Sequence, residues 1–555
     1  MFRRALIATA CVGSAIALFA CGGTDSSAPV TSQNALQTAT PIKHLVVIYG
    51  ENVSFDHYFG TYPNAANPSG EPAFNAAPGT PSVNGLSGLL LTANPNATNP
   101  ANGAGATNPF RLDRTQAATA DQNHAYTAEE QAYDNGLADL FPKYTGNGSS
   151  GGAGAFGTTG QVMGYFDGNT VTALWNYAQR FAMSDNAYTS TYGPSTPGAL
   201  NVIAGQTDGM QIVKTSKAVS TLAKTSYYIN DGQGGLTMIN DVDPGFDACS
   251  STTDQAMMSG KNIGDLLNAR NITWGGFMGG FNLSTTNANG TTGCKRSTIA
   301  TAVNAATADY IPHHNWFQYY ASTANPQHTR PSSVAAIGAS VETDGKTPEP
   351  ANHQYDSDDF FAAVKAGNFP SVSFLKAPAA QDAHAGYSDP LDEQQFVAKV
   401  INFLQQQPDW QNTAVIVTYD DSDGWYDHAY TKPTRASFDA VDQLNGNGVC
   451  GSGAATTGVG GAAVNGRCGP GTRIPFVVVS PWAKQNYVSH TLIDQASIVR
   501  FIEDNWLGGQ RIGGGSFDAT AGDLSDLFNF SGTVNATPLY LDPTLGTKVA
   551  TAPSI

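Results

Sequence analysis

Five short and almost uninterrupted apolar segments constrain what this 555-residue chain can fold into. An antiparallel strand with one face in water alternates apolar and polar residues, whereas continuous hydrophobicity is typical of strands covered on both faces. The segments therefore predict a central sheet that is buried on both sides. They are the run around Val46–Ile48, "NITWGGFMGG" from 271, "PSVSFLKAP" from 370, "TAVIVTYDD" ending at Asp421 and "RIPFVVVSPWA" from 473.

Helical patterns alternate with these segments. In "DPLDEQQFVAKVINFLQQQ", from 389, Asp389 is suited to the N-cap and Pro390 to the first turn, and an apolar face follows. "LIDQASIVRFIEDNW", from 492, has a similar pattern and stops before Gly508. Strands that alternate with helices indicate an α/β fold. We expect three layers, with a mostly parallel central sheet flanked by helices and long loop insertions.

The N-terminus predicts export. "MFRRALIATACVGSAIALFAC" has two arginines, an apolar run and small residues before Cys21, which is typical of a signal peptide over 1–20. The end of this segment resembles a bacterial lipobox, so Cys21 is expected to carry a lipid anchor in the periplasm or outer membrane. Ordinary cleavage and secretion is the alternative. Residues 21–40 form a polar tether, and 41–555 are expected to be one domain with irregular insertions near 61–115 and 440–472.

The net charge limits which partners the protein can bind, and the cysteine content indicates an oxidising compartment. The net charge of −17 lacks the basic footprint that nucleic acid requires, so we expect no nucleic-acid partner. Beyond the signal peptide and Cys21, four cysteines remain, and an even number in an exported chain favours disulfides. Proximity pairs Cys249 with Cys294 and Cys450 with Cys468. Three pairings exist, however, and the sequence does not choose between them.

Polar side chains follow two of the apolar segments at the point where a buried strand should end. Glu51 and Asn52 follow the first segment, and Asp420 and Asp421 end the fourth. Ligands in open α/β sheets bind beyond the carboxyl ends of strands, and hard oxygen ligands suit a divalent cation. Each acid alone would more often be a cap or a turn residue. Taken together, they predict a site for one divalent metal ion, because carboxylates packed without a cation would repel one another.

A candidate nucleophile and several histidines complete the pattern. Ser195 lies in a turn, "GPSTPG", that is rigid because of its prolines. Pro197 stands where a G-x-S-x-G elbow needs glycine, so a Ser–His–Asp hydrolase is poorly supported. A serine held against a metal ion is activated in another way. Imidazoles can neutralise a phosphoryl group or protonate a leaving oxygen, although a lone histidine is more often structural. The histidines singled out are His124, His313, His314 and His384.

Five motifs resemble those of the bacterial phosphoesterase family of acid phosphatases and phospholipases C. They are "GENVSFDHYFG", "GPSTPG", "HHNWFQYY", "HAGYSDP" and "VTYDDSDGWYDH", which occur in the family's order between about residues 42 and 506. The resemblance implies a core fold similar to alkaline phosphatase. It also implies one metal ion among Glu51, Asn52, Ser195, Asp420 and Asp421. It implies phosphate binding by His124, His314 and His384, with His313 as a further candidate.

The resemblance also favours one of the possible functions over the others. Phospholipases C of the family usually carry threonine, followed by Pro-Asn-Arg, where this chain has Ser195 and "TPGALN", which favours the acid phosphatase branch. We therefore expect a metal-dependent phosphomonoesterase that works through a phosphoserine, with His384 protonating the leaving alcohol. Phospholipase C is the main alternative, and a non-catalytic, calcium-stabilised surface lipoprotein is the other. The metal could be magnesium, manganese, calcium, zinc or iron.

Overall fold

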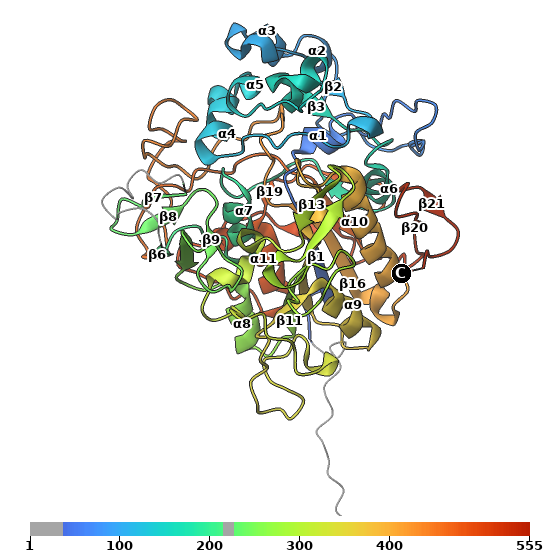
Figure 1. Ribbon diagram of the computed structural model, residues 1–555, viewed down its shortest axis with the longest axis vertical. Helices are drawn as coiled ribbons and strands as arrows, with labels where there is room; N and C mark the ends of the chain where they lie inside the picture. The colour runs from blue at the N-terminus through green and yellow to red at the C-terminus, as the bar shows by residue number, and fades with distance from the viewer. Residues whose placement is uncertain (1–36, 215–226, 555) are drawn as a thin grey trace, which may run out of the picture.

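An eight-stranded sheet forms the centre of the computed structural model, which describes residues 37–214 and 227–554 (Figure 1). Neighbouring strands run parallel except at β17, which is antiparallel to both β16 and β4. The prediction of a mostly parallel sheet is confirmed. In spatial order the strands are β14 (Gln354–Asp356), β11 (Trp274–Met278), β15 (Val372–Lys376), β1 (His44–Gly50), β16 (Thr413–Tyr419), β17 (Phe476–Val479), β4 (Ala182–Ser184) and β18 (Tyr487–Ser489).

The middle strands account for the near-continuous hydrophobicity of their sequences. Every residue of β1, β15 and β16 is buried, because helices cover both faces of the sheet. Strand β1 pairs in parallel with β15 on one side and with β16 on the other, and Gly50 is opposite Tyr419. The residues that follow these strands therefore leave the sheet side by side at one edge.

Two groups of helices enclose the sheet (Figure 1). On one side α10 contacts α6, and Phe403 of α10 stacks edge-on against Phe361 of α9 at 5.1 Å between ring centroids. On the other side α7 contacts both α8 and α11. The three-layer prediction is therefore confirmed. The bounds are α6 (Thr172–Arg180), α7 (Ser195–Ala204), α8 (Ile263–Ala269), α9 (Ser357–Lys365), α10 (Pro390–Leu404) and α11 (Ala496–Trp506).

The helix ends follow from local sequence. Asp389 caps α10 by accepting hydrogen bonds from the backbone N–H groups of Leu391 and Asp392, as its position before Pro390 predicts. Helix α11 begins at Ala496, four residues later than its apolar pattern suggests. The reason is tertiary, since β19 (Ile493–Asp494) pairs with β5 (Ala187–Tyr188).

The predicted insertion at 61–115 is mostly irregular and contains the short helices α2 (Leu89–Thr92) and α3 (Pro95–Thr98). These lie with α4 (Tyr126–Tyr133) and α5 (Phe141–Tyr144) at the end of the molecule beyond the carboxyl edge of the sheet (Figure 1). Disulfides join Cys249 to Cys294 and Cys450 to Cys468, which confirms the pairing by proximity.

The predicted signal peptide, Cys21 and most of the tether fall outside the described residues. Within residues 37–214 and 227–554, we find no helix with both the length and the apolar character needed to cross a bilayer.

Candidate active site at the carboxyl edge of the sheet

The two predicted pairs of polar residues meet at the exits of β1 and β16. Glu51, Asn52, Asp420 and Asp421 are all buried. The backbone N–H of Asn52 donates a hydrogen bond to Asp420 Oδ1 at 3.0 Å, and Asn52 itself adopts a left-handed backbone conformation with φ of 60°. This turn directs the side chains of two neighbouring strands into one place.

The candidate nucleophile reaches the same place from helix α7. Ser195 is the first residue of that helix and is buried. Its hydroxyl lies 3.0 Å from Glu51 Oε2 and 3.3 Å from Asp421 Oδ2, so one proton faces two carboxylate acceptors. Gly198 permits this approach, because a Cβ at that position would lie only 2.2 Å from the backbone oxygen of Asp420. The first turn of α7 therefore rests directly on the exit of β16.

The oxygen atoms of this cluster fit a divalent cation. Asn52 Oδ1 and Asp420 Oδ2 are buried and have no hydrogen-bond partner among the described residues, although buried polar atoms are normally satisfied. Burial and the neighbouring Asp420 raise the pKa of both Glu51 and Asp421 well above the usual range of carboxyl groups. A cation would satisfy the two free oxygens and relieve the repulsion between the carboxylates.

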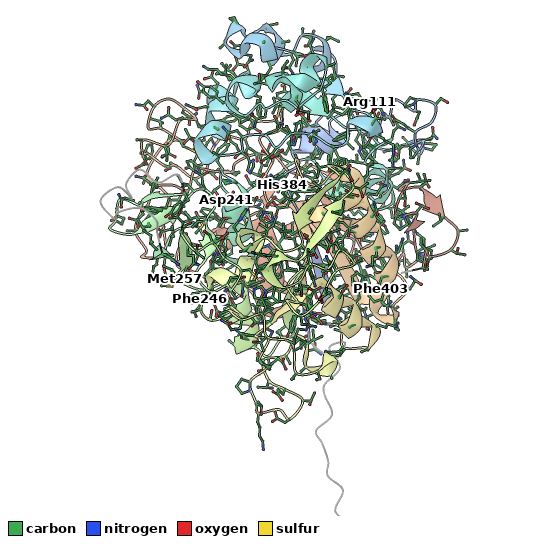
Figure 2. The ribbon with its side chains drawn as sticks, viewed as in Figure 1. Arg111, Asp241, Phe246, Met257, His384 and Phe403 are labelled. Carbon is green, nitrogen blue, oxygen red and sulfur yellow. A yellow bond between two sulfur atoms is a disulfide. The ribbon has the colours of Figure 1, made fainter. Side chains whose placement is uncertain are left out.

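The four candidate histidines lie together beside this cluster. The His384 ring lies 6.1 Å from His314 and 6.2 Å from His124, measured between ring centroids, and His313 lies 4.5 Å from His314. His384 is found where the helices beyond the sheet edge meet the sheet (Figure 2). The geometry thus brings together histidines from three segments that are far apart in the chain.

The histidines differ in charge because their surroundings differ. Burial opposes protonation of His124, but nearby Asp421 and Asp423 prevail and raise its pKa well above the usual value. His124 Nδ1 lies 3.2 Å from Asp423 Oδ1. Burial lowers the pKa of His384. Burial, together with His313 and the nearby Lys376, lowers the pKa of His314 further.

Four acidic or basic residues of the site were missed by the sequence reasoning. Lys376 ends β15 and contacts Glu51, and Asp382 lies near His314. Asp423 accepts a hydrogen bond from the Asn52 side chain at 3.0 Å. Glu129 accepts one from the Gly193 backbone and one from Ser422, which ties α4 to both the serine turn and the β16 exit. For Lys376 the sequence does carry a signal, because this lysine stands inside the otherwise apolar segment "VSFLKAP".

Other residues of two of the quoted motifs connect the segment that follows β1 with the segment that follows β16. Asp56, in "SFDHYFG", accepts a hydrogen bond from the backbone N–H of His428, in "GWYDH", and pairs with its ring at 2.6 Å. His57 stacks on Trp425 with 3.9 Å between ring centroids. Arg473 is fully buried and bonds Asp56 through one nitrogen. These contacts join the segments that follow β1 and β16, and we therefore assign these residues a structural role.

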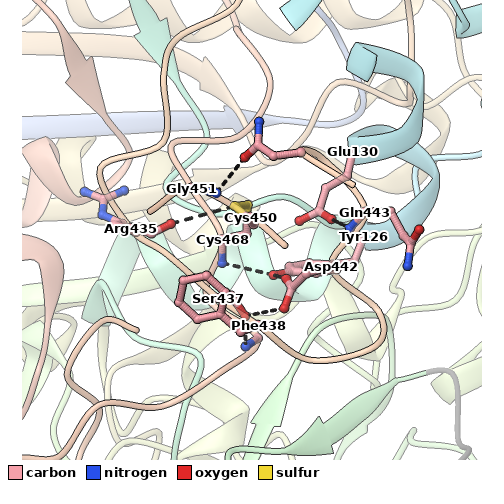
Figure 3. Close-up of a disulfide and its surroundings, with 12 residues drawn as sticks. Tyr126, Glu130, Arg435, Ser437, Phe438, Asp442, Gln443, Cys450, Gly451 and Cys468 are labelled. Atoms are coloured by element: carbon pink, nitrogen blue, oxygen red, sulfur yellow. Dashed lines mark hydrogen bonds between the residues drawn. A yellow bond between two sulfur atoms is a disulfide. The ribbon is translucent and has the colours of Figure 1, made fainter. Parts of the chain in front are cut away.

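The Cys450–Cys468 disulfide supports the site from outside (Figure 3). The Tyr126 hydroxyl donates to Asp442 Oδ1 at 2.7 Å and accepts a hydrogen bond from the backbone N–H of Cys468 at 3.0 Å. The carbonyl of Cys468 accepts a hydrogen bond from Tyr192, three residues before Ser195. The predicted insertion at 440–472 therefore contacts both the His124 segment and the serine turn.

Comparisons with known proteins identify the family of the chain. A family model described as "Phosphoesterase family" matches residues 42–507. Phospholipase C A of Mycobacterium tuberculosis is 24% identical over 518 residues, which cover 91% of this chain and 81% of that protein. Non-hemolytic phospholipase C of Burkholderia pseudomallei is 24% identical over 520 residues, covering 91% of this chain and 61% of that protein.

Two further similarities are partial or remote. Non-hemolytic phospholipase C of Pseudomonas aeruginosa is 31% identical over 180 residues, 31% of this chain and 25% of that protein. A solved structure of a protein in the alkaline phosphatase superfamily from Vibrio parahaemolyticus is 12% identical, and the match covers 63% of this chain and 62% of that one. Its TM-score is 0.26, too low to bear on the fold.

Proposed function

The chain belongs to the phosphoesterase family, and from that premise we propose that it is an exported, metal-dependent phosphomonoesterase with Ser195 as its nucleophile. One observation carries the proposal: the Ser195 hydroxyl lies between Glu51 Oε2 and Asp421 Oδ2 at the carboxyl edge of the sheet. A serine at a helix start, aimed at two buried carboxylates beside a group of histidines, has the parts that phosphoryl transfer through a covalent intermediate needs.

The proposed metal ligands are the side chains of Glu51, Asn52, Ser195, Asp420 and Asp421. A divalent cation held there would lower the pKa of the Ser195 hydroxyl and offset the negative charge of the phosphoryl oxygens. The oxygen donors suit magnesium, manganese or calcium, and zinc and iron also accept such ligands.

The chain's own residues supply the proton transfers. As Ser195 Oγ forms its bond to phosphorus, Glu51 takes the hydroxyl proton across their 3.0 Å hydrogen bond. The bond between phosphorus and the ester oxygen breaks, and the leaving alcohol takes a proton from a histidine. Water then attacks the phosphoserine and returns a proton to that histidine. Inorganic phosphate leaves, and Ser195 recovers its proton from Glu51.

The histidine that protonates the alcohol is better sought at His124 than at His384. His384 Nδ1 lies 2.6 Å from the carbonyl oxygen of Ala385, so in the neutral ring Nδ1 carries the hydrogen and Nε2 has none to give. His124 is surrounded by carboxylates that favour its charged form, in which both nitrogens carry hydrogen. The expectation for His384 as the acid stays a prediction, and the histidines together would bind the phosphate.

Phospholipase C activity is the second candidate, and the relatives favour it. The three proteins compared above by sequence are all called phospholipase C, and two of them match over 91% of this chain. Against it stands the serine motif, "GPSTPG", in place of the threonine motif usual in that branch. Both candidates use the same nucleophile and differ in whether the phosphate carries one ester bond or two.

Two variants and two substrates test the proposal. We expect wild-type protein to prefer p-nitrophenyl phosphate over p-nitrophenyl phosphorylcholine, and Ser195→Ala to lose at least about a thousandfold in kcat. Thr196→Ala is the matched control, because this neighbouring hydroxyl lies 3.5 Å from the His313 carbonyl and interacts with Tyr319 rather than with the carboxylates. A preference for the choline diester would make the protein a phospholipase C. A few per cent of wild-type turnover in Ser195→Ala would remove Ser195 from the mechanism.

Two disulfides support export, because such bonds persist in oxidising compartments. We propose that the signal peptide directs the chain out of the cytoplasm and that Cys21 carries a lipid anchor. Labelling with a radioactive fatty acid should mark the wild-type protein and spare Cys21→Ser. Equal labelling of both would place the lipid elsewhere.

A further inference from the structure

Lys376 occupies an unusual place for a lysine. It is the last residue of β15, next to β1, and its side chain is 1% exposed. Its ammonium contacts Glu51 Oε1, while the other oxygen of the same carboxylate accepts the Ser195 hydroxyl. Glu51 therefore joins a fixed positive charge to the proposed nucleophile.

The surroundings of that ammonium form a set of donors suited to a metal ion. Glu51, His314 and Asp382 each place one donor atom within 4.8 Å of the others, and all three residues are buried. His314 Nδ1 lies 3.1 Å from Glu51 Oε1 and 3.9 Å from Asp382 Oδ2. His314 Nδ1 has no hydrogen-bond partner among the described residues, whereas Glu51 Oε1 is paired with the Lys376 ammonium. One nitrogen and two carboxylate oxygens resemble the three-residue ligand sets of zinc sites.

We propose that the Lys376 ammonium is a built-in cation that occupies the place of a second metal ion, so that this site binds one ion fewer than its donor atoms could hold. The inference deepens the proposed function, on which it rests for the first ion. It assigns a positioning role to Lys376.

The physical reason lies in the charge balance of the buried acids. Glu51, Asp382 and Asp420 are all buried at this edge of the sheet, and buried carboxylates of this number need a compensating positive charge. A bound ion supplies it only while it stays bound. An ammonium on a buried strand end cannot dissociate, and it holds Glu51 Oε1 so that Oε2 remains directed at Ser195.

The number of metal ions bound per chain tests the inference independently of catalytic activity. Lys376→Met keeps the length and apolar stem of the side chain but removes the charge. We expect the variant, equilibrated with excess Zn²⁺ and then freed of loose metal, to hold one more ion per chain than wild type. The double variant Lys376→Met/His314→Phe removes one donor and should return to the wild-type count. Lys365→Met, at the exposed end of α9, is the control and should match wild type.

The number of metal ions bound by the wild type tests the proposed function, and the additional ion bound by Lys376→Met tests the role of Lys376. A wild-type protein without bound metal would contradict the proposed function, whereas the increment alone decides the role of Lys376. Equal counts in wild type and Lys376→Met would overturn the inference, and so would an extra ion that survives loss of the His314 ring.

Loss of the buried charge could prevent Lys376→Met from folding in the absence of metal. Folding that requires Zn²⁺ in this variant, but not in wild type, would support the inference. Lys376→His, which adds a donor of its own, is the second variant. If both remain unfolded with Zn²⁺ present, or if the folded one binds no additional ion, a metal cannot replace the ammonium and the inference is wrong.

Discussion

Replacing Gly198 by alanine tests whether the contact between α7 and the end of β16 positions the nucleophile. The new Cβ would lie 2.2 Å from the backbone oxygen of Asp420 and 2.7 Å from its carbonyl carbon. Real Cβ atoms stay beyond about 3.0 Å, so the helix and the strand end must separate by roughly 1 Å. Backbone faces backbone here, and no side chain can rotate away to make room.

The separation should damage catalysis more than stability. A displacement of about 1 Å between reacting groups costs on the order of a hundredfold in rate, or about 2.7 kcal/mol in the barrier. Overpacking costs about 1–3 kcal/mol of folding free energy. Alanine is favoured over glycine inside a helix by up to about 1 kcal/mol, which offsets part of that cost. We therefore expect kcat/KM for p-nitrophenyl phosphate to fall about a hundredfold while Tm changes by only a few degrees.

Steady-state kinetics at saturating metal, together with thermal unfolding, measure both effects. Gly460→Ala is the matched control, because nothing lies within 4 Å of a Cβ at that position. It should keep both wild-type activity and wild-type Tm. If Gly198→Ala retained kcat/KM within about threefold of wild type, the claim that this contact sets the position of Ser195 would be refuted.

Three further predictions concern pH, support of the site and metal. Asp56 raises the pKa of His428 despite the opposing effect of burial, so their pair stabilises the fold fully below about pH 6.5, and this stabilisation is lost as pH rises through the raised value. The Tm difference between wild type and His428→Gln should thus be largest in acid and shrink in alkali; a constant difference would contradict the pairing. Tyr126→Phe removes the hydroxyl between Asp442 and the Cys468 backbone, and should cost about 1–3 kcal/mol in denaturant unfolding; an unchanged midpoint would contradict that bridge. Chelator should abolish hydrolysis and Mg²⁺, Mn²⁺ or Zn²⁺ restore it, and full turnover after chelation would exclude the proposed metal chemistry.

Local sequence determined much of the scaffold of the site. Buried strands are apolar throughout, so a sudden Glu-Asn or Asp-Asp marks a strand end, and parallel neighbours bring such ends to one edge. Capping is equally local, as Asp389 at the start of α10 shows. These short-range rules are sufficient to predict that Glu51 and Asp420 stand at strand ends on the same edge of the sheet.

The strand order, and with it most contacts of the site residues with other segments, was decided by the tertiary structure. Lys376 reaches Glu51 only because β15 lies beside β1, although more than three hundred residues separate them in the chain. The same holds for Asp382 beside His314 and for the disulfide pairing, which proximity favoured but could not establish. Strand order and loop closure depend on long-range packing, which no window of neighbouring residues encodes. The sequence by itself therefore determined which residues stand at the ends of strands, and the fold decided which charges those residues meet.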